Sequence, residues 1–236
     1  MTALDIGFEA IAEDALLLRF GERIDIALNA RVQAAAASLR QQLPQLECVP
    51  AYASLLLRFD PLAWPDAGAG TPHQQLQQAV GTVLEMVGTE IRASREQLIP
   101  VCYGGEYGPD LDDVARHAGL DIDGVIARHT AADYAVAMIG FAPGFPYLLG
   151  LDPALAMPRR HDPRQRVPAG SVAIGGEQTG IYPAPLPGGW QLIGRTPLRL
   201  FDTAAEPPSL LEAGDRVRFR AIGPDEFRRL EREHAR

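Results

Sequence analysis

The pattern of apolar and polar residues changes character near residue 100. Before that point, short apolar runs of strand length alternate with longer stretches whose apolar residues recur at helical spacing. The expected strands lie at residues 15–20, 46–52, 54–59 and 97–103, and the expected helices at residues 30–43 and 72–88. The order strand, helix, strand, strand, helix, strand predicts an α+β domain of the ferredoxin-like type, which is built on a split βαβ unit.

After residue 100 the pattern predicts two short helices and then many brief strands. The first helix is expected at residues 108–120, with Asp110 as its N-cap and Gly119 as its C-cap. The second is expected at residues 123–129. From Tyr134 onward, strand-like segments are separated by clusters of proline and glycine, which is typical of an all-β barrel or sandwich.

These patterns predict two domains. We place the first at residues 1–97 and the second at residues 98–236, with a charged helix at residues 225–236 closing the chain. With 236 residues, 47% of them hydrophobic, the chain is long and apolar enough to bury a sizeable core.

Composition and charge exclude several classes of protein. No apolar run approaches membrane-spanning length, and no basic segment leads from Met1 into an apolar stretch. Cys48 and Cys102 are too few for a disulfide framework. We therefore expect a cytoplasmic protein that does not enter a membrane. The net charge of −8 argues against nucleic-acid binding.

Every basic residue of the chain is an arginine, because the sequence contains no lysine. This excludes a Walker A lysine, a Schiff-base lysine and a biotinylation site, since each of those chemistries requires the lysine amine. A phosphate or carboxylate ligand must therefore be bound by arginine side chains or by backbone N–H groups.

The candidate chemistry lies in the loops between Gly140 and Pro197, which hold ten glycines and ten prolines. Stiff loops that carry a few polar groups among aromatic walls, here Tyr147 and Trp190, are typical of a small-molecule site. They are equally compatible with a barrel whose tight corners are solvated by arginine. No metal site is expected, because the chain has no HExxH or paired-cysteine motif.

Two motifs in the second half carry only weak signals. GGEQTG at residues 175–180 has the glycines of a phosphate loop, but it lacks the GK[ST] ending. Ser171 does not lie in a G-x-S-x-G nucleophile elbow. His129 is a candidate base, although a single histidine is more often structural.

Several long motifs in a fixed order resemble one known family. They are VCYGGEYGPDLDDVA, the run HTxxxYxVxxIGFAPGFPYL from His129, the run PRxxxPRxxVPAGSVAI from Pro158, and QTGIYP followed by PGGWQLIGRTP between residues 178 and 197. The chain resembles the family of the 5-oxoprolinase B subunit, also named allophanate hydrolase subunit 1, which includes an inhibitor of a sporulation histidine kinase. The resemblance is strong over residues 95–222.

The resemblance implies a cyclophilin-like β-barrel after the small N-terminal domain. It also implies an ATP-dependent enzyme in which this chain, inactive alone, works with 5-oxoprolinase subunits C and A to open the lactam of 5-oxoproline to glutamate. Which of the three chains binds ATP stays open. Two alternatives also stay open: a regulator that binds a sensor histidine kinase, and a protein related to allophanate hydrolase or carboxyltransferase.

Residue type and loop position nominate the site residues of such an enzyme. We expect anionic groups to be bound by Arg166 and Arg195, and a proton to be carried by His129. The full prediction names His129, Arg166 and Gln178 as catalytic, and Ser171, Tyr182, Trp190, Arg195 and Thr196 as substrate-binding. The stretch FAPGFPYLLG (residues 141–150) is expected to line the cleft or the contact with the C subunit.

Overall fold

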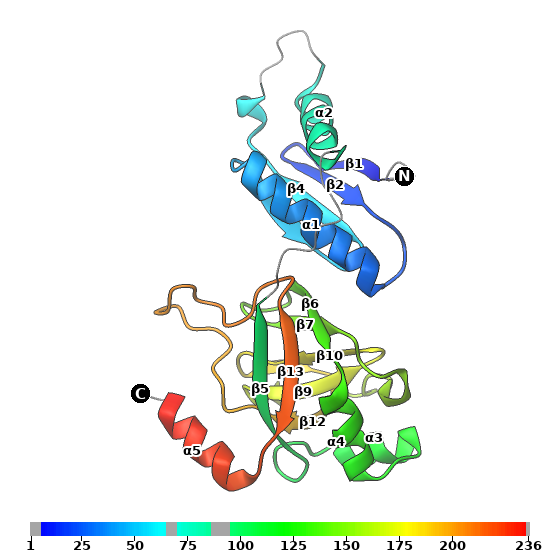
Figure 1. Cartoon of the computed structure of the whole chain (residues 1–236), viewed down its shortest axis with the longest axis vertical. Helices are drawn as coiled ribbons and strands as arrows, with labels where there is room; N and C mark the ends of the chain where they lie inside the picture. The colour runs from blue at the N-terminus through cyan, green and yellow to red at the C-terminus, as the bar shows by residue number, and fades with distance from the viewer. Residues whose placement is uncertain (1–5, 65–69, 86–94, 235–236) are drawn as a thin grey trace. The chain divides into compact units, whose positions relative to one another are not determined.

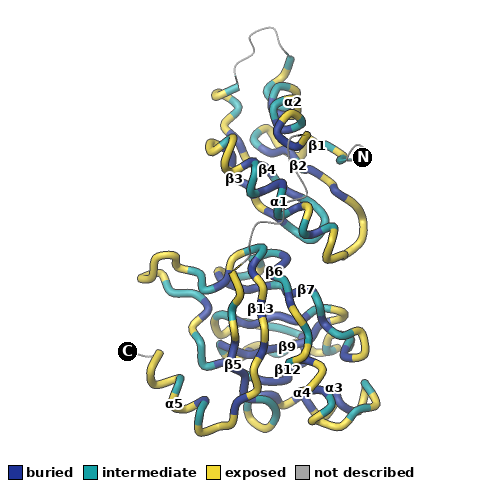
Figure 2. The backbone as a smooth tube through the Cα atoms, in the orientation of Figure 1, coloured by how far each residue is buried: buried dark blue, intermediate teal, exposed yellow. Residues whose placement is uncertain are grey.

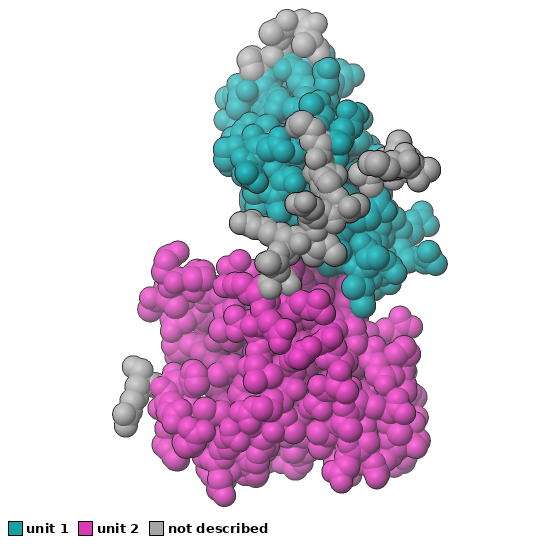
Figure 3. Space-filling view, viewed as in Figure 1, with its two compact units in different colours: residues 1–93 teal, residues 94–236 magenta. Residues whose placement is uncertain are grey.

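The computed structural model describes residues 6–64, 70–85 and 95–234. The chain forms two compact units, Met1–Ala93 and Ser94–Arg236 (Figure 3). The boundary expected after residue 97 falls inside β5 (Glu96–Tyr103), the first strand of the second unit.

The first unit is a four-stranded antiparallel sheet with two helices (Figure 1). Its elements are β1 (Gly7–Ala12), β2 (Ala15–Arg19), α1 (Ile26–Gln42), β3 (Glu47–Pro50), β4 (Ser54–Arg58), the 3-10 turn Pro61–Ala63 and α2 (Pro72–Glu85). Helix α1 begins where the Asp25 carboxylate accepts a hydrogen bond from the Leu28 N–H. Alternate strand residues and one stripe of each helix form a single core: Leu16, Leu18, Leu55, Leu57, Val32, Leu39, Leu76 and Val80.

The strand order β1-β2-β4-β3 corrects the predicted arrangement of this unit. The connection β2–α1–β3, with β4 between the two strands, is the expected split βαβ unit. The segment 97–103, however, belongs to the second unit, and the remaining edge of the sheet is formed by β1. The apolar pattern missed β1 because five of its six residues are exposed, so it has no buried face to produce an alternation. The ferredoxin-like assignment is therefore not confirmed.

The second unit contains a closed barrel, as expected for its many short strands. The strands are β5, β6 (Tyr134–Ile139), β7 (Pro146–Leu149), β9 (Ser171–Gly175), β10 (Gln178–Ile181), β12 (Gln191–Arg195) and β13 (Arg216–Ala221), in the closed order β10-β7-β6-β13-β5-β12-β9. Strands β5 and β13 pair in parallel. Inward side chains such as Ile99, Val172 and Ile193 fill the interior. Buried residues along the backbone of this unit are dark blue in Figure 2. The narrower cyclophilin-like assignment stays a prediction.

Helices and a two-stranded ribbon complete this unit. They are α3 (Leu111–Ala118), α4 (Ile122–Ala131), the 3-10 turn Pro153–Leu155, α5 (Pro224–His234), and the ribbon of β8 (Arg164–Val167) with β11 (Leu186–Gly188). Helix α3 ends as predicted at Gly119, whose φ of +66° favours glycine. Among the described residues, no helix is both long and apolar enough to cross a membrane.

Candidate functional site

The stretch FAPGFPYLLG forms a tight loop between β6 and β7. The Ala142 N–H donates to the Gly140 carbonyl at 2.8 Å, which closes a γ-turn around Phe141. Phe141 has a φ of +68°, and it is the one described residue other than glycine with a positive φ. Its ring is 61% exposed, whereas the ring of Phe145 is buried. The loop therefore holds a strained backbone in order to present one aromatic ring to solvent.

A cluster of aromatic rings lies on the outer side of the barrel wall behind this loop. Strand residues Ala173 and Leu192 face this cluster, while their neighbours along each strand face the barrel interior. Phe145 lies at its centre, with ring centroids 4.9 Å from Tyr147, 5.2 Å from Tyr182 and 5.8 Å from Trp190. We call Phe145, Tyr147, Tyr182 and Trp190, together with Arg159, the aromatic site.

Arg159 adds a cation to these rings. Its guanidinium carbon lies 5.7 Å from the Trp190 ring centroid, within the range of a cation–π contact. No carboxylate among the described residues lies within ion-pair distance of Arg159. Burial raises the pKa of both phenols, Tyr147 and Tyr182, so they remain protonated hydrogen-bond donors at neutral pH. A half-buried aromatic ring, Tyr147, beside a guanidinium without an ion-pair partner among the described residues suits contact with a small molecule that carries a carboxylate.

A buried carboxylate lies close to this site. Asp110 occupies the N-cap position of α3, as expected, but its side chain does not cap the helix. Instead, its Oδ1 accepts from Arg164 Nη2 at 2.7 Å and from Arg160 Nη1 at 3.3 Å, and its Oδ2 accepts from the Leu192 N–H at 2.7 Å. We call Asp110, Arg160 and Arg164 the arginine cluster. It joins α3, the loop before β8 and strand β12.

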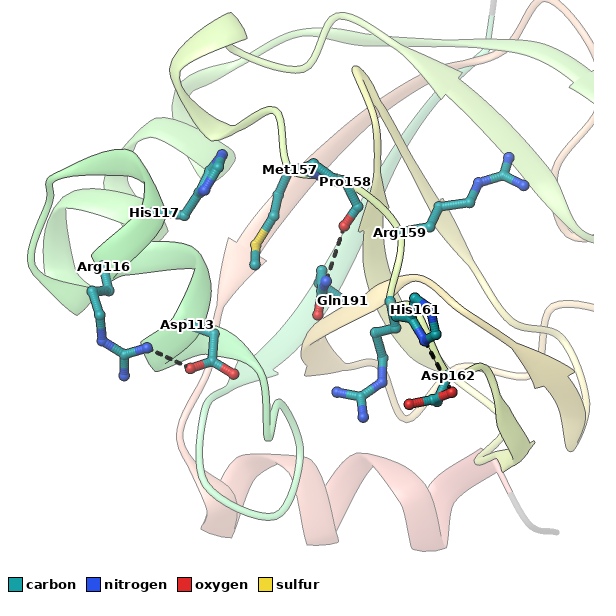
Figure 4. A pocket seen from close by; sticks show the side chains of 10 residues that line it. Asp113, Arg116, His117, Met157, Pro158, Arg159, His161, Asp162 and Gln191 are labelled. Atoms are coloured by element: carbon teal, nitrogen blue, oxygen red, sulfur yellow. Dashed lines mark hydrogen bonds and ion pairs between the residues drawn. The ribbon is translucent and has the colours of Figure 1, made fainter.

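A pocket of about 610 Å³ opens beside the arginine cluster (Figure 4). It is lined by three residues of α3, Asp113, Arg116 and His117, by the segment from Met157 to Asp162, and by Gln191. The Gln191 side-chain amide donates to the Pro158 carbonyl at 2.9 Å, as drawn in Figure 4. In the same view Arg159 points away from the α3 side chains. Arg159 contacts the Trp190 ring, whereas its neighbour Arg160 contacts the Asp110 carboxylate.

His129, the predicted proton carrier, is fully buried in a closed hydrogen-bond network. The Thr179 hydroxyl donates to the Ala173 carbonyl, so its oxygen accepts from His129 Nε2 at 3.4 Å. Nδ1 then accepts from the Tyr103 hydroxyl at 2.8 Å. Burial lowers the pKa of His129 to about 3. These contacts describe a neutral core histidine with no free nitrogen facing a ligand.

The remaining predicted residues fall into four other places. Tyr182 and Trp190 belong to the aromatic site. Ser171, Arg195 and Thr196 lie together where β9 and β12 pair, and the Arg195 Nε donates to the Ala169 carbonyl at 2.8 Å. Gln178 begins β10, and Arg166 is exposed on β8. Tyr182 and Trp190 therefore lie together, and so do Ser171, Arg195 and Thr196. His129, Gln178 and Arg166 each lie elsewhere.

Sequence reasoning missed the contribution of Asp110, Arg160 and Arg164 to a common cluster. Arg160 and Arg164 lie within the loops between Gly140 and Pro197, but nothing in the sequence indicated a shared partner. Asp110 was expected only as a helix cap. The one available signal was that Asp110 lies in the motif VCYGGEYGPD, while Arg160 and Arg164 lie in the run that begins at Pro158.

GGEQTG, the weak phosphate-loop candidate, forms a hairpin instead. Gln178 pairs with Gly175 across it, and Gly176 in the turn has a φ of +66°. The glycines of this motif thus serve a tight turn between β9 and β10. The described residues hold no group of three or more His, Cys, Asp or Glu side chains that could bind a metal ion.

Comparisons with known proteins place the chain in a family. The chain is 43% identical over 231 residues to the B subunit of 5-oxoprolinase from Bacillus subtilis (strain 168), covering 95% of this chain and 96% of that protein. It is 58% identical over 121 residues to the B subunit of 5-oxoprolinase from Escherichia coli O157:H7, covering 51% of this chain and 56% of that protein.

Solved structures show the same fold within longer chains. The crystal structure of TTHA0988 matches with a TM-score of 0.75 at 41% identity, covering 89% of this chain and 40% of that chain. The urea amidolyase of K. lactis matches with a TM-score of 0.74 at 21% identity, covering 99% of this chain and 16% of that chain, and this likeness shows the fold alone.

A family model described as the carboxyltransferase domain, subdomain C and D, matches residues 6–211. That range includes the sheet of the first unit and all of the loops that build the aromatic site. The chain belongs to this carboxyltransferase-domain family, together with the proteins named as the B subunit of 5-oxoprolinase.

Proposed function

We propose that this chain is the B subunit of a 5-oxoprolinase, a cytoplasmic complex that opens the lactam ring of 5-oxoproline to give glutamate at the expense of ATP. The observation that carries the proposal is the 43% identity to the Bacillus subtilis protein of that name, which extends over 95% of this chain and 96% of that protein. A match of this length includes both compact units.

The chemistry sets clear demands on the protein. Amide resonance makes the lactam carbon unreactive, so transfer of the ATP γ-phosphoryl group to the lactam oxygen, with release of ADP, would activate that carbon toward water. A site for this reaction needs a cation for the substrate carboxylate, donors for the oxygen that gains negative charge, and cations for the transferred phosphate.

The aromatic site supports the first two demands. We assign the substrate carboxylate to Arg159, which has no ion-pair partner among the described residues. Tyr147, the half-buried ring that packs on Trp190, contacts the ring of the substrate, and its protonated phenol serves as a donor.

Other predicted residues are available for ATP. Arg166 and Arg195 form no ion pair among the described residues, which leaves the charge of both guanidinium groups available to phosphate. Ser171, Thr196 and Gln178 supply further polar groups on the same unit. The absence of lysine makes arginine the cation that any nucleotide bound by this chain would meet.

The companions of this chain are proposed to be 5-oxoprolinase subunits A and C. The Bacillus subtilis and Escherichia coli relatives are named as subunits, and TTHA0988 is a longer chain in which this fold is one part. The exposed ring of Phe141, on its strained loop, is a suitable contact for a companion protein.

The test is the release of glutamate from 5-oxoproline, measured with this chain, its cognate subunits A and C and ATP, and with each component omitted in turn. We expect activity only in the complete mixture. Full activity in the absence of this chain would contradict the proposal and direct attention to inhibition of a sensor kinase.

A further inference from the structure

Charged side chains line the pocket beside the arginine cluster. Arg116 and Arg160 lie among two carboxylates, Asp113 and Asp162, while the third lining arginine, Arg159, points toward the Trp190 ring. The charged groups that face the pocket therefore balance, in a chain whose formal net charge is −8. A pocket without net negative charge on an acidic protein is accessible to small anions.

The two acidic side chains of the pocket differ in their surroundings. Asp113 accepts from Arg116 at 2.7 Å, whereas Asp162 lies beside His161 with its side chain 92% exposed. His117 completes the titratable lining. An anion that enters the pocket therefore meets one carboxylate that is paired with an arginine and one that is screened by solvent.

Arg160 is held in place by its own backbone. The Arg160 N–H donates to the Gly189 carbonyl at 2.7 Å, and the Gln191 amide fixes the Pro158 carbonyl at 2.9 Å. The loop is thus attached at Pro158 and at Arg160 to residues 189 and 191, next to and within β12. The backbone of Arg160 therefore starts from a fixed position, which lowers the entropy cost of binding a ligand.

Arg160 is also the surplus cation of the arginine cluster. The short bond of 2.7 Å from Arg164 already neutralises Asp110, whereas the bond from Arg160 is long, at 3.3 Å. Two guanidinium groups against one carboxylate leave one net positive charge.

Two donors of the cluster lack acceptors. Arg160 Nε and Arg164 Nη1 are buried and have no hydrogen-bond partner among the described residues. Buried donors without acceptors are unfavourable, and native proteins rarely keep them without a reason. A role confined to structure explains the short bond from Arg164 to Asp110, but it explains neither of these unpaired donors nor the long bond from Arg160.

We propose that this pocket binds a small oxyanion, a carboxylate or a phosphate group, with Arg160 as the principal cation and with Asp110 and Arg164 as the residues that position it. The proposal concerns binding by this chain alone and does not require the function proposed above. If that function holds, ATP is the source of a phosphate, whereas binding of the 5-oxoproline carboxylate here would move its assignment from Arg159 to Arg160.

The test uses the full chain without companion proteins. Its arginine Nε–H resonances are followed by ¹H–¹⁵N NMR during titration with inorganic phosphate and, separately, with 5-oxoproline, at an ionic strength held constant with sodium chloride. We expect the Arg160 Nε–H resonance to shift and saturate with at least one of the two ligands. The responding ligand identifies the source of the oxyanion.

Variants distinguish binding in this pocket from nonspecific attraction of anions to exposed arginines. Arg160→Gln should weaken binding at least tenfold, and Arg160→Lys should weaken it less, because lysine keeps the charge but loses the planar donors. Both variants retain the Asp110–Arg164 pair, and their amide spectra report whether the fold is kept. The matched control is Arg199→Gln, which removes an exposed arginine that pairs with Asp202 outside this pocket. Saturation by neither ligand, or equal affinity in Arg160→Gln and the wild-type chain, would overturn the proposal.

Discussion

Two buried polar clusters of the barrel unit differ in whether their hydrogen bonds are complete. Around His129, each donor has an acceptor, in a chain that runs from the Tyr103 hydroxyl through the imidazole and Thr179 to a backbone carbonyl. Around Asp110, the carboxylate is fully used, but the two arginines keep unpaired donors and a surplus charge.

The difference separates a structural role from a binding role. A closed network of neutral groups fixes one arrangement of the core and offers nothing to a ligand. A cluster with spare donors beside a pocket can gain hydrogen bonds when an anion enters. Burial alone would have grouped the two clusters together, since His129 and Asp110 are both buried.

The largest expected effect comes from removing the carboxylate of the open cluster. Asp110→Ala leaves two guanidinium groups without their shared counter-charge, and we expect it to lower the free energy of unfolding by about 3 kcal/mol. That is the low end of the usual range, because the Arg160 and Arg164 side chains keep 35% and 23% exposure. Urea unfolding measures the change. Asp113→Ala, which breaks an exposed ion pair on the same helix, should cost less than about 1 kcal/mol. Equal losses in both variants would remove the distinction.

The closed cluster should make stability depend on pH. The folded pKa of His129 is about 3, below the usual value of 6.5, so the unfolded chain binds the proton more readily between these pH values. Stability should therefore fall as pH falls, by about 2 kcal/mol between pH 7 and pH 5 for this group. Unfolding curves of the wild-type chain and of His129→Gln, taken at both pH values, measure it. The same pH dependence in both proteins would contradict the assignment.

A smaller effect is expected from opening the closed cluster at one bond. Tyr103→Phe removes the donor to His129 Nδ1 and leaves a buried acceptor unpaired, at a cost of about 1.5 kcal/mol. Tyr107→Phe is the control, since that ring packs on Phe227 at the periphery of the barrel and its phenol lies outside the network. A loss in Tyr103→Phe no larger than in the control would show that the network is not closed as described.

The smallest effect concerns the strained loop at the aromatic site. At Phe141, glycine should give a chain more stable than alanine by about 1 kcal/mol, because glycine adopts a positive φ without steric cost. Thermal unfolding of Phe141→Gly and Phe141→Ala makes the comparison at an exposed position where little packing is lost. A more stable alanine variant would mean that the γ-turn is not kept in solution.

Sequence patterns predicted what depends on local order. The C-cap glycine at 119 is confirmed, and the helix expected at residues 72–88 is confirmed as α2 over Pro72–Glu85, with Leu76, Val80, Val83 and Leu84 buried at helical spacing; residues 86–88 lie outside the described residues. The sequence also predicted that the second unit contains many short strands, because its brief apolar runs are separated by turn residues.

What the sequence could not supply was the pairing of distant segments. The run at 97–103 forms a strand as expected, but only its parallel pairing with β13 assigns it to the barrel. The arginine cluster joins residues separated by 50, 54 and 82 positions in sequence, so no local pattern could connect them. The predicted site residues were likewise chosen by type, and the fold places His129 inside and Arg166 outside.

The measurement that tests this account most directly is ATP-dependent glutamate release by the reconstituted complex carrying Arg159→Gln, compared with the complex carrying Tyr103→Phe. We expect Arg159→Gln to lower kcat/KM for 5-oxoproline at least tenfold, because a charge-assisted hydrogen bond to the substrate is lost. Tyr103→Phe, which disturbs only the surroundings of His129, should leave kcat/KM within about twofold of the wild-type value. The opposite result, with activity lost in Tyr103→Phe and kept in Arg159→Gln, would return His129 to the catalytic site and contradict the account.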